Sequence, residues 1–281
     1  SVMKFTLSEA QEYAIKHFYV SENAKLDIKS AKKDVWETTA IGLPQISANA
    51  DYKFVPGEIP TFSIPSPDGS IQEIEIEPKH SGTYGGTINQ LIFSGEYIVG
   101  LQASKVYKLL SEEGFEKTKI NLRQSIADSY YGLLILNKNR TILDRTLENL
   151  RLIHDQTQKM YEQGLVEDTE VDQLKISLKR TENNLATIDN QIKFMRRLFK
   201  YQLGIDLKTK IELTEDIDVL IALNMVNDTA YKFNLEENID YRMLETQEQL
   251  QELNLKREYS KFLPEISSYY NESSMVTKLM Y

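Results

Sequence analysis

Apolar residues recur every three or four positions through two long stretches of the chain, which is the spacing of one face of an α-helix. In the clearer stretch, within 171–199, the steps of three and four alternate without interruption. Its positions are Val171, Leu174, Leu178, Thr181, Leu185, Ile188, Ile192, Met195 and Phe199. Because all of them except Thr181 are apolar, the pattern is typical of a coiled-coil seam rather than of an ordinary amphipathic helix.

A partner helix for this seam is predicted just before it, over 97–161, in a segment without proline. Its apolar stripe consists of Ile126, Tyr130, Leu133, Leu136, Leu143, Leu147 and Leu150. A helix of this length spans on the order of 100 Å and needs a partner. Between the two stretches, Gly164 can end the first helix in the left-handed conformation, and Asp168 or Thr169 can cap the second. The pattern predicts a long antiparallel helical hairpin with a sharp tip.

A further helix is predicted near the start of the chain, over about 8–39. Thr6 and Glu9 have the spacing of a capping box, in which each side chain binds a backbone N–H at the helix start. Small residues dominate the stripe of Leu7, Ala10, Ala14, His17, Ser21, Ala24, Ile28, Ala31 and Val35. Small side chains let helices approach closely, which favours a tightly packed helical wall.

The period changes from helical spacing to strict alternation over residues 46–54, which predicts a β-strand long enough to cross a bilayer when tilted. One face carries Ile46, Ala48, Ala50, Tyr52 and Phe54, and the other carries Ser47, Asn49, Asp51 and Lys53. A weaker alternation over 83–89 sets Tyr84, Gly86 and Ile88 against Thr83, Gly85, Thr87 and Asn89. A long polar loop is predicted between the two strands. Two strands alone do not form a stable sheet, so others must come from a repeat or from other subunits.

An internal repeat supplies one such strand. Leu43-Pro44-Gln45-Ile46-Ser47 recurs, with one substitution, as Leu263-Pro264-Glu265-Ile266-Ser267, and both copies follow a predicted helix. We therefore expect one complete unit of helix, strand, loop, strand and helical hairpin, followed by the first helix of a second unit over 227–263 and the start of a third strand over 264–281. Because a repeat that stops inside a strand is incomplete, we expect the chain to be a fragment of a longer protein.

Composition removes several classes of function. The chain has 33 Lys and Arg against 42 Asp and Glu, so its net charge of −9 argues against a nucleic-acid partner. The absence of Cys excludes disulfides and thiolate chemistry, and three scattered His residues predict no metal site. No phosphate-binding loop, dinucleotide fingerprint or nucleophile elbow occurs in the sequence, so we expect neither an enzyme nor a cofactor.

In their order, several short motifs resemble the TolC family of outer-membrane efflux proteins. These are Leu7-Ser8-Glu9-Ala10, Leu43-Pro44-Gln45-Ile46-Ser47, Ile88-Asn89-Gln90-Leu91-Ile92-Phe93-Ser94-Gly95, Tyr161-Glu162-Gln163-Gly164-Leu165-Val166 and Tyr201-Gln202-Leu203-Gly204. The sequence departs from the family where Leu91 follows Gln90, a position at which the family commonly has proline. The family's last strand, second hairpin and acidic constriction residues are absent from the sequence.

The resemblance implies a fold class that is mainly α with a small β part, in which long antiparallel helical hairpins form an α-barrel wall joined to the strands of a trimeric transmembrane β-barrel. It assigns 1–42 and 94–203 to a periplasmic tunnel, 43–93 to a strand hairpin with an extracellular loop at 55–79, and 204–226 to an equatorial linker. It also implies an outer-membrane location with a periplasmic extension in a Gram-negative bacterium, after removal of a signal peptide.

The resemblance further implies a passive channel of a tripartite efflux or type I secretion system, for drugs, other small molecules or polypeptides. Its partners would be two further copies of the chain, outer-membrane lipid, a periplasmic adaptor, and an inner-membrane pump of resistance-nodulation-division, ABC or major facilitator type. The expected adaptor contact is the hairpin tip, comprising Gly164, Leu165, Val166, Asp168, Thr169 and Val171. Equally, Gly164 can serve only to end its helix.

The resemblance also implies which face of the alternating strands meets water and which meets lipid. Ser47, Asn49, Asp51, Lys53, Thr83, Thr87 and Asn89 are expected to face a water-filled lumen, and Ile46, Ala48, Ala50, Tyr52, Phe54, Tyr84 and Ile88 to face lipid. Two alternatives stay open. A periplasmic adaptor also has a long helical hairpin, but the lipoyl-like half-motifs that should flank it are missing. A soluble coiled-coil scaffold leaves the alternating strand and the repeated junction unexplained.

Overall fold

The computed structural model describes residues 2–58, 61–65, 69, 71–75, 79–225 and 234–278. The chain divides into two compact units. We call the first, Ser1–Lys29 with Leu110–Glu245, the hairpin unit, and the second, Ser30–Leu109 with Thr246–Tyr281, the strand unit. Among the helices in the described ranges, none combines the length and the apolar character needed to cross a membrane.

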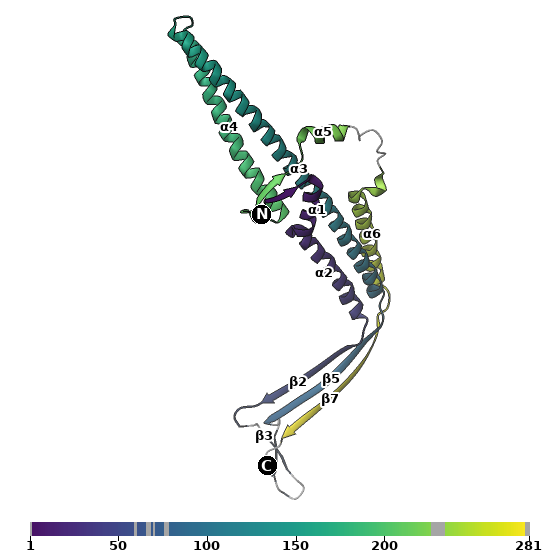
Figure 1. The fold of residues 1–281 in the computed structure, drawn as a ribbon. Coiled ribbons are helices and arrows are strands. Elements are labelled where there is room, and N and C mark those ends of the chain that lie inside the picture. Colours follow the sequence, from purple (N-terminus) through teal and green to yellow (C-terminus); the bar gives the residue numbers. More distant parts are fainter. Residues whose placement is uncertain are drawn as a thin grey trace. The chain divides into compact units, whose positions relative to one another are not determined.

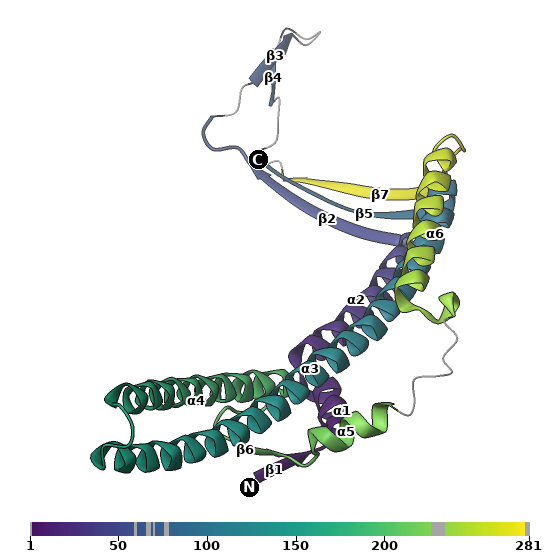
Figure 2. The same cartoon turned by 90° about the horizontal axis from the view of Figure 1, so that it is seen from above.

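The hairpin unit is built on the two long helices that the sequence predicts. Helix α3 runs over Gly95–Glu162 and helix α4 over Asp168–Leu203, and the two lie side by side up to their connecting turn (Figures 1 and 2). All nine seam positions between Val171 and Phe199 are buried or half-buried. The predicted hairpin is therefore confirmed, and its seam is the one that the alternation of threes and fours specifies.

The helix predicted over 8–39 is interrupted. Helix α1 covers Leu7–His17 and helix α2 covers Tyr19–Ile41, with Phe18 in an extended conformation between them. Phe18 turns into the core, where it is 7% exposed, and the Ser21 hydroxyl donates a hydrogen bond to the Ile15 carbonyl at 2.6 Å. The break shifts the helical phase, so the expectation that His17 belongs to the packed stripe is wrong, and His17 is exposed. The Thr6–Glu9 capping box is confirmed.

The core of the hairpin unit lies where α1 packs against α3 and α4. Its fully buried members include Ala10 and Ala14 from α1, and these small side chains lie against large ones. The large ones are Ile126, Tyr130, Leu133, Phe199 and Leu203. A short parallel pair of strands, β1 over Val2–Phe5 and β6 over Lys210–Leu213, borders this core. Helix α5 follows over Ile217–Met225.

The strand unit contains an antiparallel sheet in the order β2-β5-β7. Strand β2 covers Gln45–Phe54, β5 covers His80–Phe93 and β7 covers Ile266–Lys278 (Figure 2). The first strand matches its prediction, and the second is longer at both ends than the predicted 83–89. The third, β7, comes from the repeated motif, so the repeat supplies a strand to the sheet as expected.

The polar loop predicted between the first two strands is not entirely irregular. Strands β3 over Thr61–Pro65 and β4 over Ile71–Glu75 form an antiparallel pair, with Thr61 opposite Glu75. Glu and Ile alternate in the sequence from Glu73 to Glu75, as the two-residue period of a strand requires. The left-handed Gly69, at φ +82°, lies between the two strands. The last part of that Glu–Ile alternation, Ile76 and Glu77, lies outside the described residues.

The repeated junction is confirmed in both copies, since α2 leads into β2 and helix α6, over Ile239–Ser260, leads into β7. Helix α6 begins later than the predicted 227, because the Asn238 side chain accepts hydrogen bonds from the backbone N–H groups of Asp240 and Tyr241 and so caps its start. A short 3₁₀ helix, η1 over Leu235–Glu237, precedes the cap. Residues 227–233 of the predicted helix lie outside the described residues.

Candidate functional site

The turn at the end of the hairpin is a compact helix-ending motif. Gly164 has a φ of +71°, and its N–H donates to the Tyr161 carbonyl at 2.8 Å. The next N–H, from Leu165, reaches back to the Met160 carbonyl at 2.9 Å. These two bonds satisfy carbonyls that the end of α3 would otherwise leave open, which confirms the predicted conformation of Gly164.

The start of α4 differs from its prediction. Its N-cap is Glu167, so neither Asp168 nor Thr169 caps the helix, and no side-chain capping bond forms among the described residues. Glu167 holds the extended conformation, with φ −85° and ψ 156°, which an N-cap requires, whereas Asp168 is already the first helical residue. Asp168 and Glu170 instead place negative charge in the first turn, where the helix dipole favours it.

The six tip residues expected to contact an adaptor do lie together around this turn. Gly164, Leu165, Asp168 and Thr169 are exposed, while Val166 and Val171 are half-buried. The Leu165 side chain is 65% exposed although it is large and apolar. A single exposed apolar side chain is ordinary on a protein surface, so the expected adaptor contact at the tip stays a prediction.

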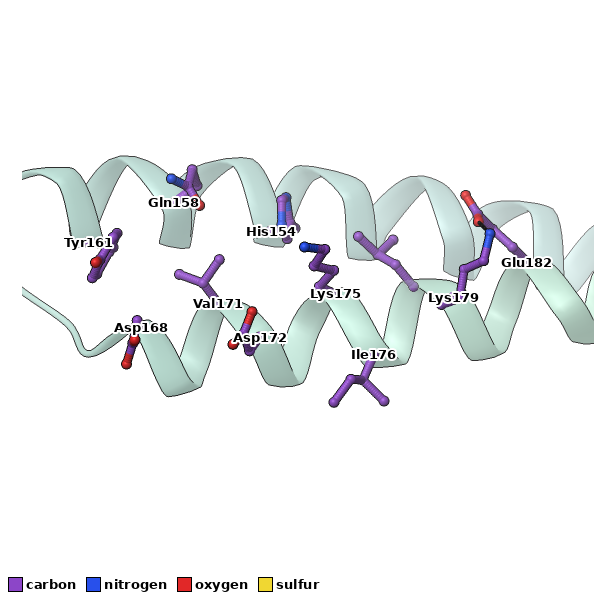
Figure 3. Close-up of a pocket in the computed structure, with 11 residues that line it drawn as sticks. His154, Gln158, Tyr161, Asp168, Val171, Asp172, Lys175, Ile176, Lys179 and Glu182 are labelled. Carbon is purple, nitrogen blue, oxygen red and sulfur yellow. Dashed lines mark hydrogen bonds and ion pairs between the residues drawn. The ribbon is translucent and has the colours of Figure 1, made fainter.

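Behind the tip, a groove of about 760 Å³ separates the facing sides of α3 and α4, and the sequence analysis did not predict it. Figure 3 shows His154, Gln158 and Tyr161 on α3 facing Val171 and Lys175 on α4, while Ile176 points away. On α3 the apolar stripe ends at Leu150 and polar side chains follow, so the seam near the tip is not filled. The position of His154 on the helical stripe was the only signal of this change.

The register of the sheet shows whether the residues predicted to be lipid-facing in β2 and in β5 lie on the same face of the sheet. Residues directly opposite each other share a face, and Ile46 pairs with Ile88, Ala50 with Tyr84, and Asp51 with Thr83. The two predicted sets therefore lie on opposite faces, which we call the apolar face and the polar face. The apolar face is open, with Ile46 78% exposed and Tyr52 71% exposed. At the far end of this face the Tyr52 hydroxyl lies 2.7 Å from His80 Nδ1, and Phe54 stacks on the same ring.

Strand β7 adds a residue that sequence reasoning did not identify. The register places Tyr270, Glu272 and Ser274 on the apolar face, with Glu272 opposite Gly86. The Tyr270 hydroxyl donates a hydrogen bond to the Glu272 carboxylate at 3.2 Å. No faces were predicted for this strand, because its pairing partner could not be read from the sequence. In the described ranges no group of three or more His, Asp or Glu residues is placed to hold a metal ion.

A long helical hairpin joined to antiparallel strands is the fold of several solved outer-membrane channels. The chain is similar to the outer membrane protein VceC of Vibrio cholerae, with a TM-score of 0.69 and 14% identity over 98% of this chain and 69% of that one. It is similar to CusC, with a TM-score of 0.74 and 16% identity over 97% of this chain and 60% of the CusC chain. It is also similar to the CmeC outer-membrane channel of Campylobacter jejuni, with a TM-score of 0.72 and 14% identity over 98% of this chain and 62% of the CmeC chain. The chain thus spans between 60% and 69% of these three channel chains.

A comparison of the sequence with models of known protein families identifies the family. The outer membrane efflux protein family matches residues 22–194, which is more than half of the chain. The chain belongs to this family, and the resemblance to TolC-like proteins is confirmed. No curated protein sequence matches the chain significantly.

Proposed function

We propose that this chain is part of the outer-membrane channel of a tripartite efflux or type I secretion system, acting as a passive conduit. The two-faced sheet supports this most directly. In β2 and β5, large apolar side chains lie open on one face, and Ser, Thr, Asn and Asp line the other. A soluble sheet would cover its apolar face with protein, whereas a sheet between lipid and water leaves it open.

The assembly proposed for this channel is a trimer. Strands β2 and β7 are the edges of the described sheet, and unpaired backbone groups at an edge are costly in hydrocarbon. Further strands from the complete protein and from two other copies would close the sheet into a barrel. The polar face, including Asn49, Asp51 and Thr87, would then line the lumen.

The hairpin tip is the proposed contact with a periplasmic adaptor, which would link the channel to an inner-membrane pump of resistance-nodulation-division, ABC or major facilitator type. The exposed Leu165 beside acidic residues supports this role. Drugs, other small molecules or polypeptides would be the transported substrates, and the site of action would be the outer membrane of a Gram-negative bacterium.

Two tip variants of the full-length protein test the adaptor contact. Gly164→Pro breaks the turn, and Leu165→Ser removes the apolar side chain while keeping the turn intact. Both should abolish drug resistance in cells although trimers still form. Gly69→Pro is the matched control, since Gly69 is also left-handed with no described atom near the position of a side chain, and it should retain resistance. Full resistance with both tip variants would reject the tip as the adaptor contact.

The strand faces are tested by a charge placed on either side of the sheet. Asp51→Lys should insert into bilayers and shift the ion selectivity of the channel towards anions, because the new charge lines the pore. Ala50→Lys on the other face should insert poorly, because a lysine facing lipid at mid-bilayer costs about 2–4 kcal/mol. Normal insertion of Ala50→Lys with altered selectivity would reverse the assignment of the faces. A periplasmic adaptor or a soluble scaffold would give no conductance with any variant.

A further inference from the structure

The strand unit contains a pocket of about 480 Å³ where α2, α3 and α6 meet the sheet (Figure 1). Its apolar and aromatic walls come from Ile41 in α2, Leu91 in β5 and Tyr97 in α3. Charged side chains complete the lining, and these are Glu96 from α3, Arg257 from α6 and Glu265 just before β7. The volume lies in the range of pockets for small organic ligands, and the lining offers such a ligand both apolar and ionic contacts.

The strand side of this pocket lies on the polar face of the sheet. Leu91 and Thr87 belong to the same uninterrupted register of β5 with β7, and their even spacing puts both on one face. Glu265 comes just before Ser267, the partner of Leu91, and lines the same pocket. Because the proposed function turns the polar face towards the lumen, the pocket would open towards the molecules that pass through the channel.

The ion pair in the pocket is loose. Arg257 Nε lies 3.8 Å from Glu96 Oε1, and both side chains are about half exposed, at 45% and 51%. This separation is longer than a charge-assisted hydrogen bond, which is about 2.7–2.9 Å. A cationic ligand can therefore approach the Glu96 carboxylate without first breaking a tight ion pair.

The second carboxylate of the pocket, from Glu265, differs from its counterpart in the first copy of the repeat. There, Gln45 Nε2 donates to the carbonyls of Ala40 at 2.7 Å and of Leu43 at 3.0 Å, so its side chain closes the junction locally. A carboxylate cannot donate these bonds. Glu265 forms no hydrogen bond or ion pair with any residue that the structure describes, so its charge in the pocket is not neutralised.

We propose that this pocket binds amphipathic organic cations in transit through the lumen, which are molecules with a protonated amine beside an aromatic or aliphatic body. Glu96 and Glu265 bind the ammonium group. Ile41, Leu91 and Tyr97 contact the apolar body. The exposure of the carboxylates keeps the binding weak, and weak binding lets a transported molecule leave again. This inference rests on the proposed function, since it names a substrate class for the proposed conduit.

The charge balance of the pocket decides which ligands it selects. Two carboxylates against one guanidinium give the lining a charge of −1, which attracts a cation and disfavours an anion. A neutral molecule of the same shape keeps the apolar contacts and loses the ionic ones. A small ammonium ion without an apolar body keeps only the ionic contacts. The pocket should therefore bind an amphipathic cation more tightly than any of these three.

The test uses the full-length protein in lipid nanodiscs and three probes that share a naphthalene ring. These are the cation 1-naphthylmethylamine, the neutral 1-naphthylmethanol and the anion 1-naphthoate, and empty nanodiscs correct for partition into lipid. Equilibrium dialysis at neutral pH should give an affinity for the amine about fivefold higher than for the alcohol, the effect expected of partly exposed ion pairs. The naphthoate should bind more weakly than the alcohol, and an equal concentration of ethylamine should not displace the naphthyl amine.

Two changes in the lining should act in opposite directions. Glu96→Gln combined with Glu265→Gln should bring the ratio of amine to alcohol affinity close to one. Arg257→Gln should raise the affinity for the amine about twofold, because it removes a like charge and frees the Glu96 carboxylate. A role of these residues in stability alone would not give opposite signs for the same ligand.

Matched controls carry the same substitutions at exposed helix positions away from the junction, and they should keep the wild-type affinities. They are Glu148→Gln with Glu248→Gln for the carboxylates, and Arg196→Gln for the guanidinium. Equal affinities of the wild type for the amine and the alcohol would overturn the cation site. A preference for the amine that is unchanged in the Glu96 and Glu265 double variant would overturn it as well.

Channel recordings in planar bilayers separate this inference from the proposed function. The amine should reduce the wild-type current, and it should do so less in the double variant. Binding of the amine without any effect on the current would place the pocket outside the lumen and overturn the inference. A protein with normal conductance and no preference for the amine refutes only the cation site, whereas one without conductance refutes the proposed function as well.

Discussion

Two glycines with the same backbone conformation end the two long helices, and their surroundings differ. Gly164 ends α3 at a φ of +71°, and Gly204 ends α4 at +70°. A Cβ atom on Gly204 would lie 2.8 Å from the His17 carbonyl oxygen, whereas one on Gly164 would meet no described atom within 4 Å. Within the described chain, the first glycine ends its helix without a close neighbour, while the second also lets the end of α4 approach the break between α1 and α2.

The same contrast holds for the seam at the two ends of α4. At the base, Tyr130 and Phe199 are fully buried, with ring centroids 6.0 Å apart. Near the tip, His154 and Lys175 face each other across an open groove. The base gains its stability from its own packing, whereas the tip leaves contact surface available, which is what a docking region requires.

The largest expected effect comes from truncating a fully buried core leucine at the base. Leu203 is fully buried, so Leu203→Ala should lower the free energy of unfolding by about 3–5 kcal/mol, the usual cost of a cavity in a packed core. The same substitution at Leu178, which is half-buried and lines the tip groove, should cost roughly 1–2 kcal/mol. Thermal unfolding followed by circular dichroism measures both. Equal losses at the two sites would contradict the contrast between base and tip.

The two glycines give the next comparison. Gly164→Ala should cost about 1 kcal/mol, because a left-handed conformation is strained for alanine even in open space. Gly204→Ala carries the same strain and in addition a clash with the backbone at His17, and it should cost roughly 3 kcal/mol. Denaturant titrations of both variants beside the wild type measure the difference. If the two costs agree, the close approach at Gly204 contributes nothing to stability.

The sequence predicts the hairpin well because its signal is local and repeated. The seam from Val171 to Phe199, the left-handed Gly164 and the Thr6–Glu9 capping box each depend on residues close together in the chain. The break at Phe18 instead lies against the end of α4, where the C-cap residue Gly204 closely approaches the His17 carbonyl. A contact between residues so far apart in sequence leaves no periodic trace, so the uninterrupted stripe of small residues predicted one helix.

The candidate sites show the same limit. The alternation of residues within β2 predicted its two faces, and the pairing of β2 with β5 agrees with that prediction. Placing Glu272 on a face, however, needed the register of β7 against β5. The groove behind the tip forms only where two separate helices meet.

The smallest expected effect concerns the hydroxyl of Tyr130 at the base, which donates a hydrogen bond to the Phe5 carbonyl at 3.1 Å. Burial, followed by the nearby Glu215 carboxylate, raises the pKa of Tyr130 well above its usual range. Because the unfolded chain ionises this tyrosine near pH 10 and the folded protein only at higher pH, the neutral hydroxyl stabilises the fold fully below about pH 10 and progressively less above it.

Tyr130→Phe should therefore cost about 1 kcal/mol at pH 7, through the lost hydrogen bond. The variant cannot ionise at this position, so the difference in stability from the wild type should shrink as the pH rises from about 9 to about 11. Urea titrations at several pH values measure it, with Tyr161→Phe at the exposed tip as the control that should match the wild type throughout. A difference that stays constant up to pH 11 would mean that the Tyr130 hydroxyl ionises no less readily in the folded protein than in the unfolded chain.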